Sequence, residues 1–330
     1  MENKYPYELV FQTPNDENYF FGYFNKKQLS IDNLNLLALR IPSFDKILNF
    51  DDNVEIGFFN LNDKKFHHID YTNAANWQQG CKLEWLGPDN LSDVIYNKFI
   101  DEKLVSVKYN IVTGKKNIYD YPVYSVSDNG ETALGLDFER HYFFRRGYSY
   151  DFNPPNFKKN KPTIDDDYIS LIDLKKNEQK KIIFLKDMIN KNYISSMDGA
   201  THYLEHMEIN PSGTRFVFLH RWRLVDGGIY ARLYSSDMNG ENISLLNDSG
   251  RMSHYSWRND NEILAYGGVE TRVNRLRKFK NISKYFIKPL LPVYHFLFNH
   301  SSKVAKAVRG DGYMLIEDIS SNNIRIAKSI

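Results

Sequence analysis

The sequence has little cysteine, since Cys81 is the only one among 330 residues. A lone cysteine cannot close an internal disulfide, and the chain has no Cys-x-x-Cys pair that could bind zinc. We therefore expect Cys81 to be a buried strand residue and predict no metal site from the residues themselves. Met1–Tyr7 is polar and charged, so it lacks the apolar stretch of a secretion signal.

Long apolar runs and an excess of one charge are also missing. Phe286–Phe298 is the longest apolar stretch, but two prolines, Lys288 and His295 interrupt it, and it is too short to span a bilayer. The chain carries 43 basic against 41 acidic side chains, so its bulk charge predicts no nucleic-acid partner. We expect a soluble, cytoplasmic protein.

Aromatic residues are abundant, at 15% of the chain, and they favour pleated sheets. A repeat is visible along most of the sequence: strand, polar turn, strand, longer link, strand, polar turn, strand. The turns are rich in Gly, Asn, Asp and Pro, which suit tight hairpins. Each unit takes about 40–50 residues, the period of a β-propeller blade.

Five such units can be placed. The expected strands are Tyr23–Ser30, Leu36–Ile41, Val54–Leu61 and Lys65–Ile69; Cys81–Leu86, Asp93–Phe99, Leu104–Val112 and Lys116–Tyr119; Val123–Ser127, Thr132–Phe138, Tyr168–Leu174 and Lys180–Leu185; His202–Ile209, Arg215–His220, Tyr230–Ser236 and Asn242–Leu246; and Ser253–Trp257, Glu262–Tyr266, Tyr313–Asp318 and Arg325–Lys328.

The fold class that follows is all-β, a β-propeller of four-stranded antiparallel blades forming one domain over residues 1–330. A β-sandwich is the structural alternative, whereas a parallel sheet would need more helical segments than the sequence offers. A propeller must leave only short, protected edges. Either five blades close alone or the chain is a shortened form of a larger ring, and Tyr7–Gln12 could supply a strand that completes the last blade.

One stretch, His202–Tyr266, resembles bacterial oligogalacturonate lyases and the related propeller polysaccharide lyases, which include ulvan lyases. The matching motifs follow in the same order and at similar spacing: His206 in a strand, Asn210-Pro211-Ser212-Gly213, Phe218-Leu219-His220-Arg221, Ala231-Arg232-Leu233-Tyr234, Met238-Asn239-Gly240 and Ser253-His254-Tyr255-Ser256-Trp257. Asp120–Tyr150 also resembles a lyase-related propeller group that is often encoded beside bacterial surface-polysaccharide genes.

The resemblance implies a seven-bladed fold, of which this chain looks like the first five blades. It implies that Arg232 and His254 correspond to the arginine and histidine that carry out the chemistry. The related lyases also hold a divalent metal, Mn²⁺, through histidines of their last two blades, and the region matching those ligands is absent from this sequence. No cofactor is therefore assigned.

The reaction implied is β-elimination on a uronate. A base removes the proton next to the carboxylate, and a cation neutralises the charge that develops. Histidine suits the first role near neutral pH, and an arginine fork suits the second. His254 as base and Arg232 as carboxylate clamp are thus chemically sensible. Each also has a structural interpretation, as a strand histidine or a surface arginine.

Further candidates for binding an acidic sugar lie near this pair and in an insertion of the third blade, Arg140–Asp167. They are His206, His220, Arg221, Arg223 and Tyr255, and, from the insertion, His141, Arg145, Arg146 and Tyr148. Arginines beside aromatic rings suit carboxylated or sulfated sugars. The alternatives stay open: a strand end stabilised by cation–π contacts, and a solvated loop with its tyrosines packed beneath it.

Residues 271–309 form a second insertion, in the fifth blade, with ten Lys or Arg residues and no acid. Arg272–Lys288 could be a basic helix, and the aromatic stretch beyond it could lie at an anionic membrane surface. Docking to an acidic partner or glycan is a second interpretation, and packing of its apolar face on the propeller is a third.

Two functions follow. The first is a lyase-like, carbohydrate-active propeller acting on uronate-containing oligosaccharide through His254 and Arg232. The second is a non-catalytic glycan-binding or scaffold propeller in surface-polysaccharide production. Acidic oligosaccharide is the expected partner in both, and the sequence leaves open whether the chain is an enzyme.

Overall fold

A computed structural model describes residues 8–89, 91–152, 167–224, 227–268, 278–279, 311–319 and 324–326. Contacts divide the chain into two compact units, the first comprising 1–123 and 145–157 and the second 124–144 and 158–330. The prediction that residues 1–330 form one domain stays a prediction.

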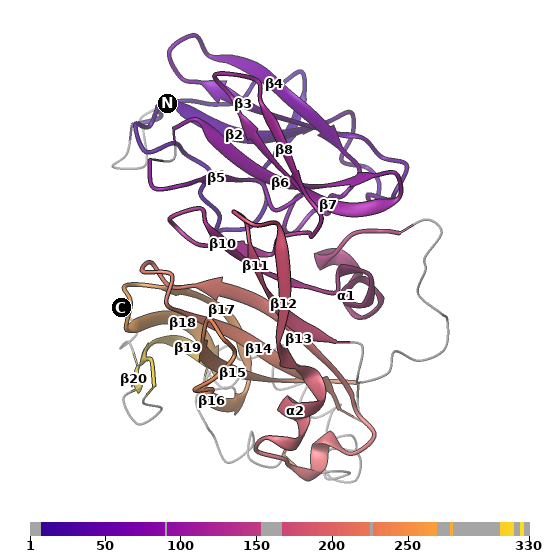
Figure 1. Ribbon diagram of the computed structural model, residues 1–330, viewed down its shortest axis with the longest axis vertical. Coiled ribbons are helices and arrows are strands. Elements are labelled where there is room, and N and C mark those ends of the chain that lie inside the picture. The colour runs from indigo at the N-terminus through magenta and orange to yellow at the C-terminus, as the bar shows by residue number, and fades with distance from the viewer. Residues whose placement is uncertain are drawn as a thin grey trace, which may run out of the picture. The chain divides into compact units, whose positions relative to one another are not determined.

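The first unit contains two four-stranded antiparallel sheets, each with its strands in chain order (Figure 1). Blade one consists of β1 (Asn18–Phe20), β2 (Asn35–Ile41), β3 (Val54–Asn60) and β4 (Lys65–Thr72). Blade two consists of β5 (Glu84–Leu86), β6 (Asp93–Ile100), β7 (Lys103–Asn110) and β8 (Lys116–Tyr119). A short 3₁₀ turn, Arg146–Tyr148, belongs to the same unit.

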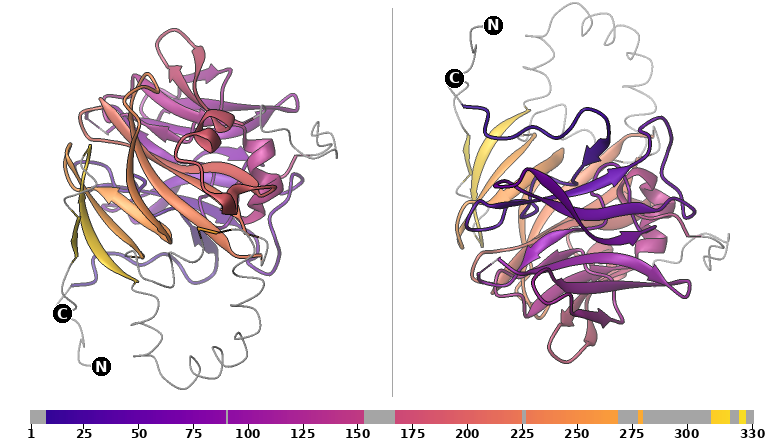
Figure 2. Two further views of the ribbon diagram at one scale, coloured as in Figure 1. Left: turned by 90° about the horizontal axis from the view of Figure 1, so that it is seen from below. Right: turned by 90° about the horizontal axis from the view of Figure 1, so that it is seen from above.

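The second unit contains three more sheets of the same kind, which Figure 2 shows as separate twisted layers. Blade three is β9 (Ser125–Val126), β10 (Thr132–Leu136), β11 (Tyr168–Asp173) and β12 (Glu178–Phe184); blade four is β13 (Thr201–Ile209), β14 (Arg215–Arg223), β15 (Ile229–Asp237) and β16 (Ser244–Gly250); blade five is β17 (Met252–Trp257), β18 (Glu262–Gly268), β19 (Asp311–Glu317) and β20 (Ile324–Ile326). Its helices are α1 (Phe138–Phe144), α2 (Leu185–Asn190) and a 3₁₀ turn at Ser195–Met197.

The predicted fold class, all-β with five four-stranded antiparallel blades of the propeller type, is confirmed in the described residues. Most strand boundaries agree to within three residues, and Lys116–Tyr119 agrees at both ends. The prediction for the first strand was wrong. Tyr23–Ser30 is a turn followed by one isolated bridge, and the strand lies earlier, at Asn18–Phe20.

The blades share a turn signature that explains their regular spacing. In each of blades one to four, the third strand ends in an asparagine or aspartate whose side-chain oxygen accepts hydrogen bonds from backbone N–H groups of the following turn. These residues are Asn60, Asn110, Asp173 and Asp237. Such side chains bond their own backbone two or three residues on and so favour a turn over continued strand.

The insertion Arg140–Asp167 begins in helix α1 rather than in a loop. Arg140 and His141 are both buried in this helix, whose N–H group at Arg140 donates to the Asp137 carboxylate at 2.9 Å. The predicted strand Thr132–Phe138 was two residues too long, since β10 ends at Leu136. The strand ends there because Asp137 caps the N-terminus of helix α1. Residues 153–166 of this insertion lie outside the described residues.

The blades of the second unit pack through their apolar faces. In blade four, Val217, Leu219, Ala231 and Leu233 share one face, and they form one buried cluster with Met252, Tyr255, Trp257, Ile263, Ala265, Met314 and Ile316 of blade five. Burial of apolar surface at this interface stabilises the pairing of the two sheets.

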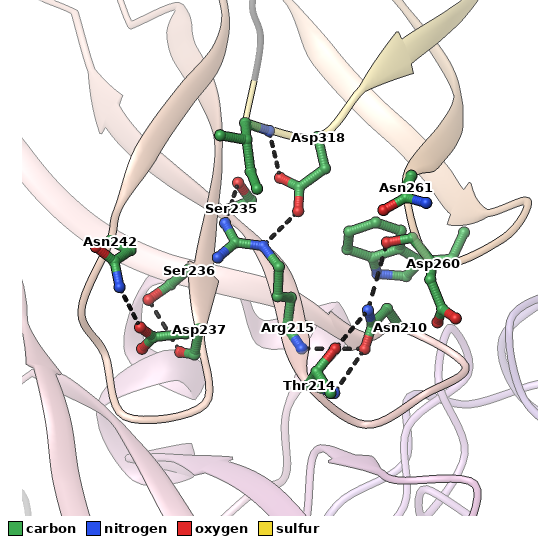
Figure 3. A network of polar contacts seen from close by, with 12 residues as sticks. Asn210, Thr214, Arg215, Ser235, Ser236, Asp237, Asn242, Asp260, Asn261 and Asp318 are labelled. Atoms are coloured by element: carbon green, nitrogen blue, oxygen red, sulfur yellow. Dashed lines mark hydrogen bonds and ion pairs between the residues drawn. The ribbon is translucent and has the colours of Figure 1, made fainter.

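Polar contacts also join blades four and five, as Figure 3 shows. Arg215 of β14 pairs with Asp318, which follows β19, and donates to Ser235 Oγ at 3.1 Å. The Asn210 side chain donates to the Asp260 carbonyl at 3.4 Å, so the turns of the two blades are tied together. These contacts fix the two blades at the ends of their strands.

No helix within the described part of the chain is long and apolar enough to cross a bilayer. Of the basic insertion 271–309, only Lys278 and Phe279 are described, so the predicted helix and the predicted membrane contact lie outside the described residues.

Candidate functional site

The first strand of blade four, β13, contains a bulge at His206. The pairing of β13 with β14 shifts between Glu205 and Glu208, and His206 has a φ of 56°, which non-glycine residues rarely adopt. Its backbone N–H donates to the Tyr124 hydroxyl at 3.1 Å, and the Tyr255 hydroxyl donates to its carbonyl. Two buried tyrosines thus hold a strained backbone conformation of the kind that often marks functional positions.

The bulge places a buried carboxylate among three nitrogen-bearing side chains. Glu205 is fully buried, and its oxygens lie 2.7 Å from Arg221 Nε, 3.2 Å from His141 Nε2 and 3.4 Å from His206 Nδ1. Four of our predicted binding residues therefore meet here: His141, His206 and Arg221 around Glu205, and Tyr255 through the carbonyl of His206. We call this the Glu205 cluster.

The charges of the Glu205 cluster balance internally. Burial alone would raise the pKa of Glu205, but the Arg221 guanidinium and the imidazoles of His206 and His141 outweigh it and hold that pKa well below its usual value. Arg221 makes a second contact within the protein, because its Nη2 donates a hydrogen bond to the Met252 carbonyl at 3.2 Å. The geometry is that of a structural ion cluster joining α1, β13, β14 and β17.

A second cluster lies on the opposite face of blade four. His220 and Trp222 alternate with Arg221 along β14, so their side chains point the other way. Arg232 pairs with His220 in the strand register and shares its face. Its guanidinium lies 5.1 Å from the Trp222 ring, a cation–π contact, and Trp222 stacks on Tyr230 at 4.4 Å.

The imidazoles of His202 and His220 in this cluster form a chain of hydrogen bonds in which donor and acceptor can be assigned. His202 Nε2 lies 3.2 Å from the Met197 carbonyl, which can only accept, so this nitrogen carries the proton. His202 Nδ1 is then the acceptor for His220 Nε2, 3.0 Å away. Burial lowers the pKa of His202 to about 4 and that of His220 well below its usual value, so both rings are neutral.

Two nitrogens of the Arg232 guanidinium donate hydrogen bonds to other groups of the protein. The side chain is 1% exposed; Nε donates to Asp248 at 2.7 Å and Nη1 donates to the Asn192 carbonyl at 2.7 Å. Burial would lower the pKa of Arg232, but the bond to Asp248 outweighs it and raises that pKa. Lys278 lies 2.7 Å from the other oxygen of Asp248.

His254 lies on a different surface from Arg232. Ala231 and Leu233 face the cluster shared with blade five, so Arg232 between them faces away from it. Tyr255 and Trp257 of β17 face the same cluster from the other side, so His254 also faces away from it. Arg232 and His254 therefore point in opposite directions from the interface between their two sheets.

The exposed face of blade five carries a row of rings. His254, Tyr266 and Tyr313 stand directly opposite one another in the register of β17, β18 and β19. Tyr266 and Tyr313 are 41% and 60% exposed, and their ring centroids are 5.2 Å apart. Leu264, 50% exposed, lies two residues away on the same face. We call His254, Tyr266 and Tyr313 the blade-five row.

The remaining predicted residues lie elsewhere. Arg223 ends β14 and is exposed. Arg145, Arg146 and Tyr148 belong to the first unit, where the Arg145 guanidinium lies 4.2 Å from the centre of the Tyr148 ring.

The sequence analysis did not single out some residues of these sites. Glu205 and Tyr124 gave no signal, since a single acid or tyrosine in a strand is unremarkable without its neighbours. Tyr266 and Tyr313 could have been found, because each alternates with buried residues along its strand.

The described part of the chain offers no ligand set for the Mn²⁺ that the family resemblance implies. Within the described residues, no group of three or more His, Cys, Asp or Glu side chains is arranged to hold a metal ion. We derive no step that involves one.

Comparison with known proteins finds no matching family model and no matching curated sequence. Among solved structures, the chain is similar to an oligogalacturonate lyase from Vibrio parahaemolyticus, with 13% identity over 79% of this chain and a TM-score of 0.49; it spans 62% of that lyase. It is also similar to a TolB candidate from Agrobacterium tumefaciens, with 11% identity and a TM-score of 0.44. That match covers 80% of this chain and 74% of the TolB candidate. A third is the β-propeller domain of the Trilobed protease from Pyrococcus furiosus, with 10% identity, 91% and 80% covered, and a TM-score of 0.37.

Proposed function

We propose that this chain is a carbohydrate-binding propeller protein that holds a uronate-containing oligosaccharide on blade five without cleaving it. The observation that carries the proposal is the blade-five row. Two exposed tyrosines and a histidine lie side by side across three strands of one sheet face. Contiguous exposed apolar groups on a soluble protein often mark a binding surface.

The chemistry of the row suits a sugar. An aromatic ring offers a flat apolar face on which the C–H face of a pyranose can stack, and the tyrosine hydroxyls can bond to sugar hydroxyls. The His254 imidazole adds a group that can donate to a carboxylate. Ser253 Oγ lies 2.8 Å from His254 Nδ1 and helps to orient this ring.

The state of Arg232 favours binding over β-elimination. A carboxylate clamp must reach the same sugar as the base, yet the guanidinium of Arg232 is bonded to Asp248 and Asn192 on the face of blade four that points away from blade five. Freeing it would leave Asp248 without its buried partner, which is costly. His254 would therefore act without a cation beside the carboxylate.

The test is to titrate the whole chain with oligogalacturonate by calorimetry and to follow the ultraviolet absorbance of unsaturated uronate products, with and without added Mn²⁺. We expect saturable binding and no product. Tyr313→Ala should weaken binding about three- to tenfold, the loss of one aromatic contact. Tyr193→Ala is the matched control, because Tyr193 is 52% exposed in the same unit but outside the row.

Two outcomes would overturn the proposal. Equal losses in Tyr313→Ala and Tyr193→Ala would show that the row is not the site. Product that forms with wild-type protein and disappears in His254→Ala would show that the chain is a lyase.

A further inference from the structure

A cleft of about 390 Å³ opens at one end of blade one, within the first unit. Its lining comes from the segment before β1, the end of β2, the start of β3 and the end of β4. The residues are Asp16, Glu17, Asn18, Arg40, Ile41, Pro42, Asn53, Glu55 and Tyr71. A cavity of this size falls in the range of small-molecule sites.

One wall of the cleft is held rigid by a chain of ion pairs. Arg40 Nη1 donates to both oxygens of Glu17, at 2.7 and 2.8 Å, and Nε donates to Glu55 at 2.7 Å. His68 Nδ1 lies 2.8 Å from the other oxygen of Glu55. The Arg40 guanidinium also lies 5.0 Å from the Phe66 ring. A wall tied in this way is preorganised, so a ligand need not order it.

Other lining groups keep hydrogen-bonding capacity. Asp16 and Asn53 are exposed and make no hydrogen bond or ion pair with any other described residue. The carboxylate offers acceptors only, whereas the amide offers both donors and acceptors. Tyr71, which is 48% exposed, adds an aromatic ring to the lining.

The charge of the cleft is negative. Three carboxylates, of Asp16, Glu17 and Glu55, face one guanidinium, that of Arg40, which leaves two negative charges in excess. An anionic ligand would be repelled, while a cationic group would be attracted, most strongly at Asp16, which no described cation neutralises. The cleft thus differs in charge from what a uronate site requires.

We propose that this cleft binds an amino sugar with a protonated amine. The ammonium group would bond to Asp16, the ring hydroxyls to Asn53 and to the remaining acceptor positions of Glu17, and the apolar face of the sugar would lie on Tyr71. This proposal is independent of the blade-five row, since its residues come from the other unit and select the opposite charge.

The experiment is to titrate the whole chain with D-glucosamine near neutral pH and to follow binding by NMR. N-acetylglucosamine keeps the sugar ring but loses the charge, and we expect it to bind about tenfold more weakly, the loss of one charge-assisted hydrogen bond. Asp16→Asn should weaken D-glucosamine binding by a similar factor and leave N-acetylglucosamine binding unchanged. Tyr71→Ala should weaken the binding of both sugars.

Asp120→Asn is the matched control, because it makes the same change of charge in the same unit at a side chain that is 55% exposed and outside the cleft. Binding to this variant should equal that of wild type. Equal affinity for the two sugars, no saturable binding of D-glucosamine, or equal effects of Asp16→Asn and Asp120→Asn would each overturn the proposal. Tyr313→Ala should leave D-glucosamine binding intact, which separates this result from the fate of the blade-five row.

Discussion

The Glu205 cluster predicts a large loss of stability from a change of very few atoms. Glu205→Gln keeps the shape of the side chain but removes its charge, so Arg221, 8% exposed, would be left buried without a counter-charge. Breaking a buried ion pair by removing one partner costs about 3–5 kcal/mol. Domains are typically stable by about 5–15 kcal/mol, so about a fifth of the stability or more would be lost.

The exposed pair Lys103–Asp120 is the natural comparison. Its atoms are 2.7 Å apart, as in the buried pair, but its side chains are 58% and 55% exposed. Solvent screens such pairs, and they contribute about 0–1 kcal/mol. Asp120→Asn should therefore change the free energy of unfolding by less than about 1 kcal/mol.

The assay is urea unfolding followed by near-ultraviolet circular dichroism, with the free energy of unfolding extrapolated to water. The double variant Glu205→Leu with Arg221→Met should be more stable than Glu205→Gln, because two apolar side chains leave no unpaired charge. The reasoning would be refuted if Glu205→Gln were within about 1 kcal/mol of wild type, or if the double variant were the less stable of the two.

Three further predictions concern other buried features. Gly240→Ala should destabilise the protein by several kcal/mol, because a Cβ there would lie 2.2 Å from the Ile182 carbonyl oxygen. Gly213 also has a positive φ, but a Cβ there would meet only the Ser127 Cβ, at an ordinary contact distance of 3.7 Å. Gly213→Ala should therefore cost only about 1–2 kcal/mol in the same urea assay. Cys81, fully buried and with its pKa raised by burial to about 12, should not react with a thiol reagent until the protein unfolds, and labelling of the native protein would contradict its placement. The pKa of His202 is about 4 in the folded protein, below the value of 6.5 in the unfolded chain. Between these two pH values the unfolded state binds more protons than the folded state. The free energy of unfolding therefore decreases as the pH falls from 6.5 to 4. Between pH 7 and pH 4, wild type should lose on the order of 3 kcal/mol more than His202→Gln, measured as the difference between their urea curves; parallel losses would disprove the assignment.

The blade repeat could be predicted from the sequence because it depends on interactions between residues that are close together in the chain. Asn110 and Asp237 end their strands by bonding to the next few backbone N–H groups, and the alternation of apolar residues marks the strands between such turns. The first strand was misplaced because Asn18–Phe20 is only three residues long and lies beside the aromatic stretch Tyr23–Phe24, which has a similar composition but forms a turn.

The candidate sites could be predicted only in part from the sequence. His141, His206 and Arg221 were singled out for their residue types, but the sequence held no sign that Glu205 would draw them together, since His141 lies 64 residues away. Likewise, nothing in the sequence pairs Arg40 with Glu17, 23 residues before it, to build the wall of the cleft.

The sequence by itself determined the four-stranded blades and the two-residue alternation of side chains along each strand. Alternation places neighbouring residues on opposite faces, but it does not say which face another sheet will cover. Only the tertiary structure decided this, because the packing of blade four against blade five buried Leu233 and Tyr255 between the sheets. That choice turned Arg232 into a buried partner of Asp248 and left His254 in solvent.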